Sequence, residues 1–406
     1  MPKTQLRLAG AVAIGLASML GAGVFVVFRE AYSIAAGLLF FAIALAALTA
    51  TLNAASVYRL AQAVDRPGGV YSYSRVYLND SASFLSGFAF VFGKIASIAA
   101  IALVFQEYAA HSFVFWPAAG AITILTLVNI LGINRTAIVA AVLSILTVSF
   151  LTATVIGSAS AGHEGKLGQA LSLAPHNQQL FAVVQAASLL FFAFAGYARV
   201  ATLGTEVVQP KRNIPRAIAI SLGVVVALYV ALAICLLQGL GTGLATTKAP
   251  VALLAQRTFN HMPEWLPVAI ASLASLGSML ALLAGVSRTA ATMSEDRELP
   301  KFFATRNRLG APWVAEVFIS LGALVLVAMG DLSWVIGFSS FSVLFYYAIG
   351  HLSAFKQARN WGAQRIVAIG GLALCAALLV AVPGPAVPIS LAVLICALVA
   401  RKLFRR

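Results

Sequence analysis

Long, continuous apolar runs, separated by short polar segments, cover most of the chain. Because these runs do not alternate apolar and polar residues, they predict membrane-spanning helices rather than the strands of a barrel. At about 20 residues per crossing, we expect about twelve spans. The predicted ranges are 8–28, 33–58, 84–110, 113–132, 137–158, 180–206, 216–239, 265–290, 313–330, 332–355, 365–382 and 387–403. The sequence therefore predicts an all-α, polytopic membrane protein.

The composition supports this fold class. Hydrophobic residues make up 61% of the 406 residues and charged residues only 10%, whereas a soluble domain carries about 25% charge. No polar stretch is long enough to form a soluble domain, and Lys3 and Arg7 precede a first span that has no small-residue cleavage site. We therefore expect this first span to be retained.

The distribution of lysine and arginine predicts the orientation. If the N-terminus is cytoplasmic, 21 of the 27 lysines and arginines fall on the cytoplasmic side and 4 on the opposite side, while Lys94 and Arg199 lie inside spans. This asymmetry predicts a multi-pass protein of the cytoplasmic (inner or plasma) membrane with both termini in the cytoplasm. It also accounts for the net charge of +15 without a nucleic-acid partner.

Two of the predicted spans carry glycine interruptions. Gly21 and Gly23 lie within the first span, and Gly196, followed by Tyr197, lies within the sixth. Glycine alone also fits close helix packing. Breaks at corresponding positions of two five-helix halves, however, favour a transporter site between inverted repeats. A broken helix frees amides at the start of one half and carbonyls at the end of the other, and together these match a zwitterion.

The interrupted segments and the loops near them resemble the signature sequences of the amino acid–polyamine–organocation (APC) transporters, in particular of amino acid permeases. The stretches that carry this resemblance are Gly21–Phe25, Phe191–Tyr197 with Glu206, Pro210–Ala217, Pro67–Tyr71, and Asp296 with Leu299 and Pro300. They occur in the family's order and extend over about residues 8–360, and the last two predicted helices add little to the resemblance.

The resemblance implies a LeuT-like fold, in which five-plus-five inverted repeats with discontinuous first and sixth helices work by alternating access. The transporter core would occupy residues 1–360, with repeats at about 8–158 and 180–355. Residues 361–406 would form two additional C-terminal helices and a basic tail.

The resemblance also implies a substrate site. Its substrate-binding residues would be Met19, Gly21, Ala22, Gly23, Phe192, Ala195, Gly196 and Tyr197. By position, the amides of Ala22 and Gly23 would bind the substrate carboxylate. The carbonyls of Met19, Phe192 and Ala195 would bind its amino group. Phe192 would also be an aromatic gate, although a packing or lipid-facing phenylalanine fits the same pattern.

The groups that couple transport to an ion depart from the family pattern. Many relatives carry a glutamate after the sixth-helix aromatic residue, where this chain has Ala198 followed by Arg199. Some relatives carry a lysine in the fifth helix, where this chain has Thr147. Coupling to H⁺ or Na⁺ and exchange therefore all stay open, and we expect neither a bound organic cofactor nor a metal.

Lys94, Glu107 and Arg199 place charge inside predicted spans, where it is costly and marks a functional candidate. Lys94 follows Gly87 by two helical turns and shares its face. We hypothesise that Lys94 or Arg199 supplies the charge that the missing lysine would carry. Both could instead pair with backbone carbonyls, and Glu107 could be a snorkelling end residue. Glu206, which basic residues follow, predicts a salt bridge at a cytoplasmic gate.

These features favour a gradient-driven amino acid carrier that acts as a symporter, exchanger or exporter. Two fixed positive charges disfavour cationic substrates, so a neutral, apolar amino acid is the first expectation. An amine or polyamine carrier of the same fold is the alternative. A channel or an enzyme fits the paired breaks less well, and the sequence shows no nucleophile elbow, phosphate loop or metal-ligand spacing. The expected partners are a small-molecule substrate and the lipid bilayer, and the oligomeric state is left open.

Overall fold

The computed structural model describes residues 7–64, 68–109, 116–131, 136–160, 166–173, 179–196, 200, 207–358 and 360–404. These residues form helices without a β-strand, which confirms the all-α class. The helices are α1 (Leu8–Met19), the 3₁₀ helix η1 (Ala22–Phe25), α2 (Val27–Ala35), α3 (Leu39–Ala63), α4 (Val70–Tyr77), α5 (Asp80–Ala109), α6 (Trp116–Ile130), α7 (Thr136–Ser160), α8 (Lys166–Ser172), α9 (Gln179–Phe194), α11 (Pro210–Leu240), α12 (Pro250–Thr258), α13 (Trp265–Glu295), α14 (Trp313–Ala328), α15 (Leu332–Gln357), α16 (Ala363–Ala381) and α17 (Ala386–Phe404).

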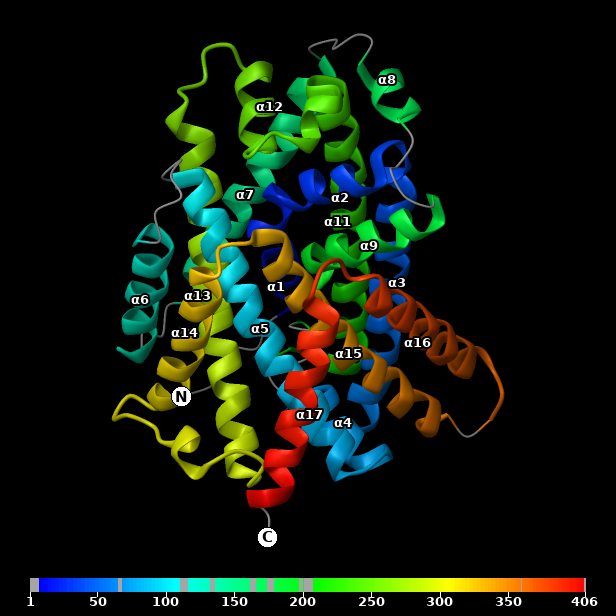
Figure 1. The fold of residues 1–406 in the computed structure, drawn as a ribbon, viewed down its shortest axis with the longest axis vertical. Helices are drawn as coiled ribbons and strands as arrows, with labels where there is room; N and C mark the ends of the chain where they lie inside the picture. The colour runs from blue at the N-terminus through cyan, green and yellow to red at the C-terminus, as the bar shows by residue number, and fades with distance from the viewer. Residues whose placement is uncertain are drawn as a thin grey trace.

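The helices form a bundle with two distinct ends. Figure 1 shows α8 and α12 at one end, and α4 and the last turn of α17 at the other; we call these the α12 end and the α4 end. Within the described residues, seven helical segments are long and apolar enough to cross a membrane, and four shorter apolar helices accompany them. This finding confirms a multi-pass protein, while the number of twelve spans stays a prediction.

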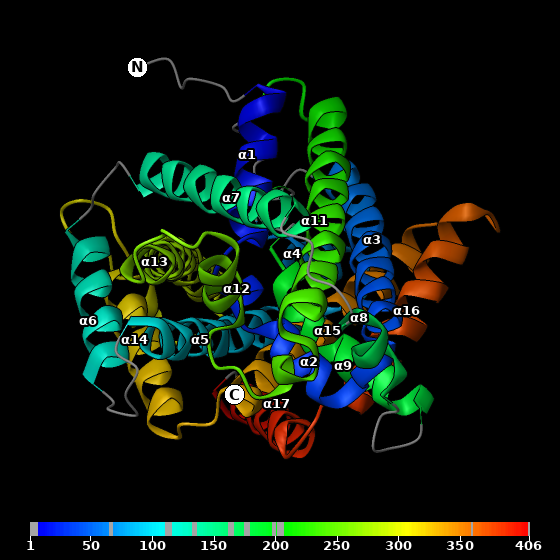
Figure 2. The same ribbon diagram turned by 90° about the horizontal axis from the view of Figure 1, so that it is seen from above.

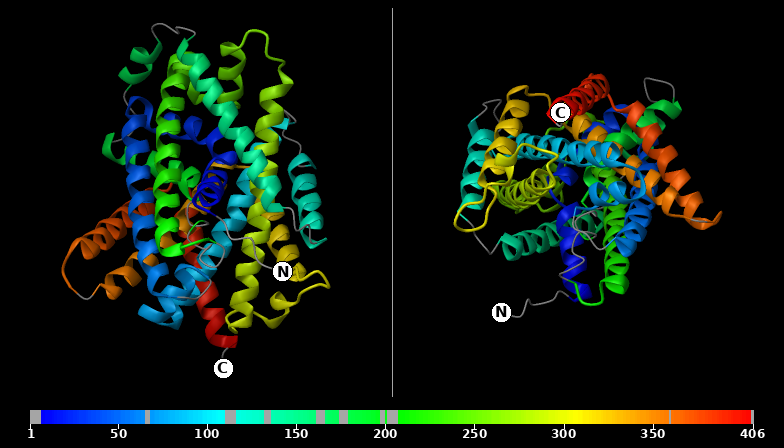
Figure 3. Two further views of the ribbon diagram at one scale, coloured as in Figure 1. Left: turned by 180° about the vertical axis from the view of Figure 1, so that it is seen from behind. Right: turned by 90° about the horizontal axis from the view of Figure 1, so that it is seen from below.

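Helix α5 lies inside the bundle, where it packs against α13, α14 and α15 (Figure 2). Small residues make this close packing possible, because Ala96, Ala99 and Ala102 are completely buried. At Gly93, an added Cβ would lie only 2.6 Å from the Cβ of Ser342 in α15. Seen from behind, α3, α7 and α11 form the opposite side of the bundle, and α1 packs against α7 and α11 (Figure 3).

The first two predicted spans, 8–28 and 33–58, are divided differently in the structure. The polar pair Arg29 and Glu30 was expected to lie in a loop, but both residues lie within α2. Their side chains pair with each other at 2.6 Å, so their charges are compensated without leaving the helix. The turn falls instead at Ala36, where φ is 46°, just before α3.

Other boundaries also differ from the prediction. Three segments that were expected to be loops contain the short helices α4, α8 and α12. In the span predicted at 180–206, α9 ends at Phe194 and a turn follows at Ala195 and Gly196. The span predicted at 216–239 begins earlier, at Pro210, because a proline in the first turn of a helix costs no hydrogen bond.

Candidate functional site

The first span is broken between α1 and η1, as its glycines predict. Gly21 has an extended backbone, with φ of −83° and ψ of −156°, so the α-helical hydrogen bonds cannot continue through it. The first three amides of a 3₁₀ helix have no carbonyl partner within that helix. Here these amides belong to Gly21, Ala22 and Gly23, and the three residues are buried. The break therefore presents three backbone donors in the interior.

The sixth predicted span is also broken. Helix α9 ends at Phe194, and a turn at Ala195 and Gly196 follows it. The Ala195 amide donates to the Phe192 carbonyl at 3.4 Å and so closes the last turn. Three of the predicted site residues lie outside the described residues: Tyr197, Arg199 and Glu206. The first predicted break is therefore confirmed, and at the second the described residues show that α9 ends two residues before Gly196.

The two breaks lie against each other. A Cβ on Gly196 would collide with the backbone of Ser18 and Met19 at the end of α1. On the other side of the contact, a Cβ on Gly23 would lie 3.2 Å from the Cα of Ala193. The structure thus brings together the interrupted segments that the sequence placed in one site, and only glycine fits where Gly196 meets α1.

A buried tyrosine joins the two breaks. The Tyr229 hydroxyl, from α11, donates to the Met19 carbonyl at 3.0 Å and to the Ala193 carbonyl at 3.2 Å. These carbonyls stand in the last turns of α1 and α9, where intrahelical donors run out. Because a carbonyl oxygen has two lone pairs, Met19 can still accept from a ligand. The sequence analysis did not predict a role for Tyr229. The sequence feature that could have indicated it is a polar aromatic residue within an apolar span.

A serine from α13 faces the first break. A Cβ on Gly21 would collide with the side chain of Ser278, so the Ser278 hydroxyl lies beside the unpaired amides. Ser275, one turn earlier, donates to the Ala271 carbonyl in its own helix at 2.8 Å. The described residues show no such bond for Ser278. The sequence prediction did not include this residue.

Phe192 and Thr147 occupy different positions relative to the breaks. Phe192 lies on the first break, because its Cδ1 would be 3.2 Å from a Cβ on Gly23. This position suits the predicted aromatic gate. Thr147 is buried in α7, and its hydroxyl donates to the Leu143 carbonyl at 2.9 Å. Thr147 therefore uses its donor within its own helix.

Lys94 is a buried cation without an acidic partner among the described residues. It lies in α5, is 8% exposed, and has no carboxylate within 4.0 Å in the described part of the chain. Its Nζ lies 6.0 Å from the centre of the Phe90 ring, one turn earlier. The alternative of a hydrogen bond to a backbone carbonyl is also not seen in these residues. Lys94 thus remains a candidate for the coupling charge.

Glu107 belongs to an ion cluster rather than standing alone as a snorkelling residue. Arg29 Nη1 lies 3.5 Å from each carboxylate oxygen of Glu107, and Arg29 Nη2 lies 2.6 Å from Glu30 Oε1. The other oxygen of Glu30 accepts from the Ser333 hydroxyl. Three helices, α2, α5 and α15, are joined in this way at the end of α5 that lies away from α4.

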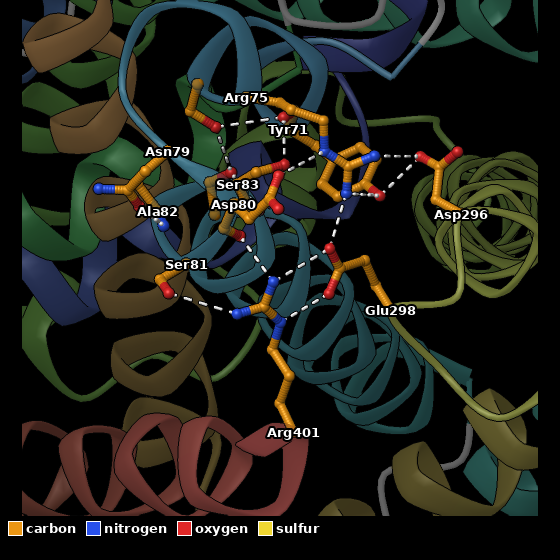
Figure 4. Close-up of polar contacts among 12 residues, drawn as sticks. Tyr71, Arg75, Asn79, Asp80, Ser81, Ala82, Ser83, Asp296, Glu298 and Arg401 are labelled. Carbon is orange, nitrogen blue, oxygen red and sulfur yellow. Dashed lines mark hydrogen bonds and ion pairs between the residues drawn. The ribbon is translucent and has the colours of Figure 1, made fainter. Parts of the chain in front are cut away.

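A second ion network lies at the α4 end (Figure 4). Its members are Tyr71, Arg75, Asp80, Asp296, Glu298 and Arg401, and we call it the α4-end network. Arg75 in α4 pairs with Asp296 at 3.1 Å and with Glu298 at 2.7 Å. Burial raises the pKa of the Tyr71 hydroxyl, which donates to Asp296 Oδ2 at 2.7 Å. The loop after α13 is therefore fixed to α4.

The same network fixes the last helix. Arg401 in α17 bonds both oxygens of Glu298, from Nε at 2.6 Å and from Nη2 at 3.2 Å. The Glu298 side chain is completely buried. Between the two acidic residues, Arg297 has a φ of 60°, which is uncommon for a non-glycine residue and turns both carboxylates toward Arg75. Four separate segments of the chain therefore meet at this network.

Comparisons with known proteins show the family of the chain. The profile of a family described as "Amino acid permease" matches residues 6–400. A protein of Mycobacterium tuberculosis named as an uncharacterized transporter is 39% identical over 399 residues, which cover 97% of this chain and 89% of the relative.

More distant relatives carry substrate names. The chloroplastic cationic amino acid transporter 7 of Arabidopsis thaliana is 25% identical over 87% of this chain and 66% of its own. The methylthioribose transporter of Bacillus subtilis is 24% identical over 79% of this chain and 76% of its own. These names refer to different kinds of substrate, so the similarity indicates transport without indicating one ligand.

Proposed function

Since this chain belongs to the amino acid permease family of APC transporters, we propose that it carries a neutral amino acid across the cytoplasmic membrane by alternating access. It is a multi-pass membrane transporter rather than an enzyme. In this proposal both termini are cytoplasmic, so the α4 end faces the cytoplasm and the α12 end faces the outside. The carrier works as a symporter, an exchanger or an exporter.

The contact between the two breaks carries this proposal. The amides of Gly21, Ala22 and Gly23 begin η1, where the helix dipole favours a negative charge. The carbonyls at the ends of α1 and α9 lie next to them and favour a positive charge. Non-helical backbone at membrane depth is tolerated where it lines a cavity or is buried in protein. A zwitterion satisfies both sets of groups at once, with the Ser278 hydroxyl as a further contact.

The preference for a neutral side chain rests on the distribution of charge. Helix α5, which carries Lys94, packs against η1. Glu30 in α2 and Glu107 in α5 both pair with Arg29. We propose that the Lys94 ammonium, without an acidic partner among the described residues, raises the cost of binding a cationic side chain in a weakly screened site, whereas Glu30 and Glu107 are already paired.

Different residues would close the substrate site toward the outside and toward the cytoplasm. On the outside, the pairs of Arg29 with Glu30 and Glu107 connect α2 to α5. On the cytoplasmic side we retain Glu206 as the predicted gate residue, together with Phe192 over the substrate. Lys94 or Arg199 would provide the coupling charge.

An amine or polyamine carrier of the same fold is the alternative. The two proposed substrate classes differ in whether they offer a carboxylate to these amides. An amine without a carboxylate leaves the three donors of Gly21, Ala22 and Gly23 unused.

Thermal melting of the purified protein with matched ligands tests this proposal. Leucine should raise the melting temperature by mass action, whereas isoamylamine, which lacks the carboxylate, and lysine, which adds a cation, should not. Uptake of radiolabelled leucine into proteoliposomes should saturate and should be stimulated by leucine on the opposite side. Stabilisation by isoamylamine, with none by any amino acid, would favour the amine carrier, and stabilisation by lysine but by no neutral amino acid would contradict the proposed preference for a neutral side chain.

A further inference from the structure

Several bases at the α4 end have acidic partners. Arg401 pairs with Glu298 at 2.6 Å, and Arg306 pairs with Glu295 at 2.9 Å. The corner where α3, α15 and α16 meet is different, since none of the three helices contains an acidic residue within its bounds. Asp65, just beyond α3, lies outside the described residues. The bases at this corner have no ion pair within 4.0 Å among the described residues, so their charge is not compensated by those residues.

Arg365 is held in a fixed orientation at this corner. It lies in the first turn of α16, and its Nε donates to the Ala358 carbonyl at 3.1 Å. Its guanidinium lies 5.0 Å from the Phe355 ring centre and 5.1 Å from the Trp361 ring centre. These contacts fix the plane of the group, and neither supplies a negative charge to its two terminal nitrogens.

Arg59 approaches the same corner from α3. The Gln357 side chain donates to the Arg59 carbonyl at 3.2 Å, which joins the ends of α3 and α15. A Cβ on Gly370 would lie 3.7 Å from Leu52, so α3 contacts α16 two turns before Arg59. Residues seven apart share one face of a helix, so Arg59 lies on the face of α3 that contacts α16. Its Nη1 is buried and has no hydrogen-bond partner among the described residues.

The apolar surroundings of the corner face outward. Trp361 is 75% exposed, and an exposed tryptophan beside a basic residue is typical of the membrane–water interface. Ile366 and Ile369, in the next turn of α16, are 67% and 44% exposed. A ligand at this corner would thus meet the Arg365 guanidinium at one end and exposed hydrocarbon at the other.

We propose that Arg59 and Arg365 bind the phosphate of an anionic phospholipid headgroup, with Trp361 at the interface and the acyl chains along Ile366 and Ile369. Guanidinium groups hold phosphate through paired, charge-assisted hydrogen bonds. Basic corners between membrane helices on the cytoplasmic side are suited to such headgroups. A free phosphate ion offers the same polar chemistry, but it would not use the exposed hydrocarbon of α16.

Melting of the purified full-length protein in detergent tests this site without reference to transport. Phosphatidylglycerol should raise the melting temperature, while phosphatidylcholine and inorganic phosphate should not. Arg59→Gln and Arg365→Gln should each weaken the apparent affinity for phosphatidylglycerol about tenfold, as expected for loss of a charge-assisted hydrogen bond. Arg365→Lys keeps the charge but not the paired geometry, and it should also bind more weakly.

Arg308→Gln is the matched control, because this exposed arginine at the same end is equally charged but remote from α16 in the sequence. Its response to phosphatidylglycerol should equal that of the unchanged protein. Three results would overturn the proposal: equal stabilisation by phosphatidylcholine, equal stabilisation by inorganic phosphate, or an unchanged response in the Arg59→Gln/Arg365→Gln double variant.

Discussion

The Tyr229 hydroxyl lies 3.0 Å from the Met19 carbonyl oxygen and donates to it. Because the same hydroxyl also reaches the Ala193 carbonyl at 3.2 Å, one side chain from α11 joins the ends of α1 and α9. Helix α11 thereby sets the distance between the two breaks. The polar groups exposed by unwinding are held in place before any substrate arrives, which lowers the cost of ordering them on binding.

Tyr229→Phe tests this joining role. Loss of the hydroxyl leaves two buried carbonyls without that donor, at a cost of about 1–3 kcal/mol. We expect a lower melting temperature and weaker substrate binding, measured by ligand-dependent melting. Tyr32→Phe is the control, because Tyr32 is equally buried and donates to the Ala170 carbonyl away from the breaks. Equal losses of binding in both variants would contradict a specific role for Tyr229.

Gly196→Ala tests the contact between the breaks. The added Cβ would collide with the backbone of Ser18 and Met19, so the two segments must separate. Overpacking of this kind costs about 1–3 kcal/mol, and we expect the rate of uptake to fall at least about tenfold. Gly223→Ala in α11 is the control, since its Cβ would meet nothing within 4 Å. Normal uptake by Gly196→Ala would show that the breaks need not touch.

The sequence predicts well those features that follow from local pattern. Continuous apolar runs require helices in lipid, so the fold class follows directly. The breaks at Gly21 and Gly196 were also predictable, because glycines at corresponding positions of two halves leave a sequence signal. The polar pair Arg29 and Glu30 was misleading, since a charge that is compensated by its neighbour can remain in a helix.

The parts of the site that depend on tertiary contact could not be predicted in the same way. Tyr229 and Ser278 come from α11 and α13, and nothing in their local sequence shows that they face the breaks. The same holds for Arg401, which lies about a hundred residues from its partner Glu298. Only the packing of helices reveals such pairs.

Ser278→Ala tests a residue that the sequence did not suggest. If the hydroxyl contacts the substrate, its loss removes one hydrogen bond worth about 0.5–1.5 kcal/mol, so affinity should fall by up to about tenfold. Ligand-dependent melting measures this change. Ser275→Ala is the matched control, because that hydroxyl bonds to Ala271 in its own helix. An unaltered affinity in Ser278→Ala would exclude the residue from the substrate site.

Lys94→Met tests the coupling charge. Methionine keeps the length of the side chain and removes a buried ammonium that has no acidic partner among the described residues. The protein should therefore fold and melt at or above the temperature of the unchanged protein. Uptake into proteoliposomes should lose its dependence on pH. Lys402→Met, at an exposed position of α17, should leave that dependence intact. A pH profile that Lys94→Met does not alter would remove Lys94 from the mechanism.

Arg401→Gln tests whether the last helix is fixed by its ion pair. Glu298 is completely buried and accepts two bonds from Arg401, so loss of the cation should cost about 1.5–3 kcal/mol and lower the melting temperature. The pair of Arg306 with Glu295 has one bond of 2.9 Å and is about half exposed, and Arg306→Gln should change stability by less than about 1 kcal/mol. If both variants had the same melting temperature, burial would not explain the contribution of the Arg401 pair to stability. Apolar packing alone would then hold α17 in place.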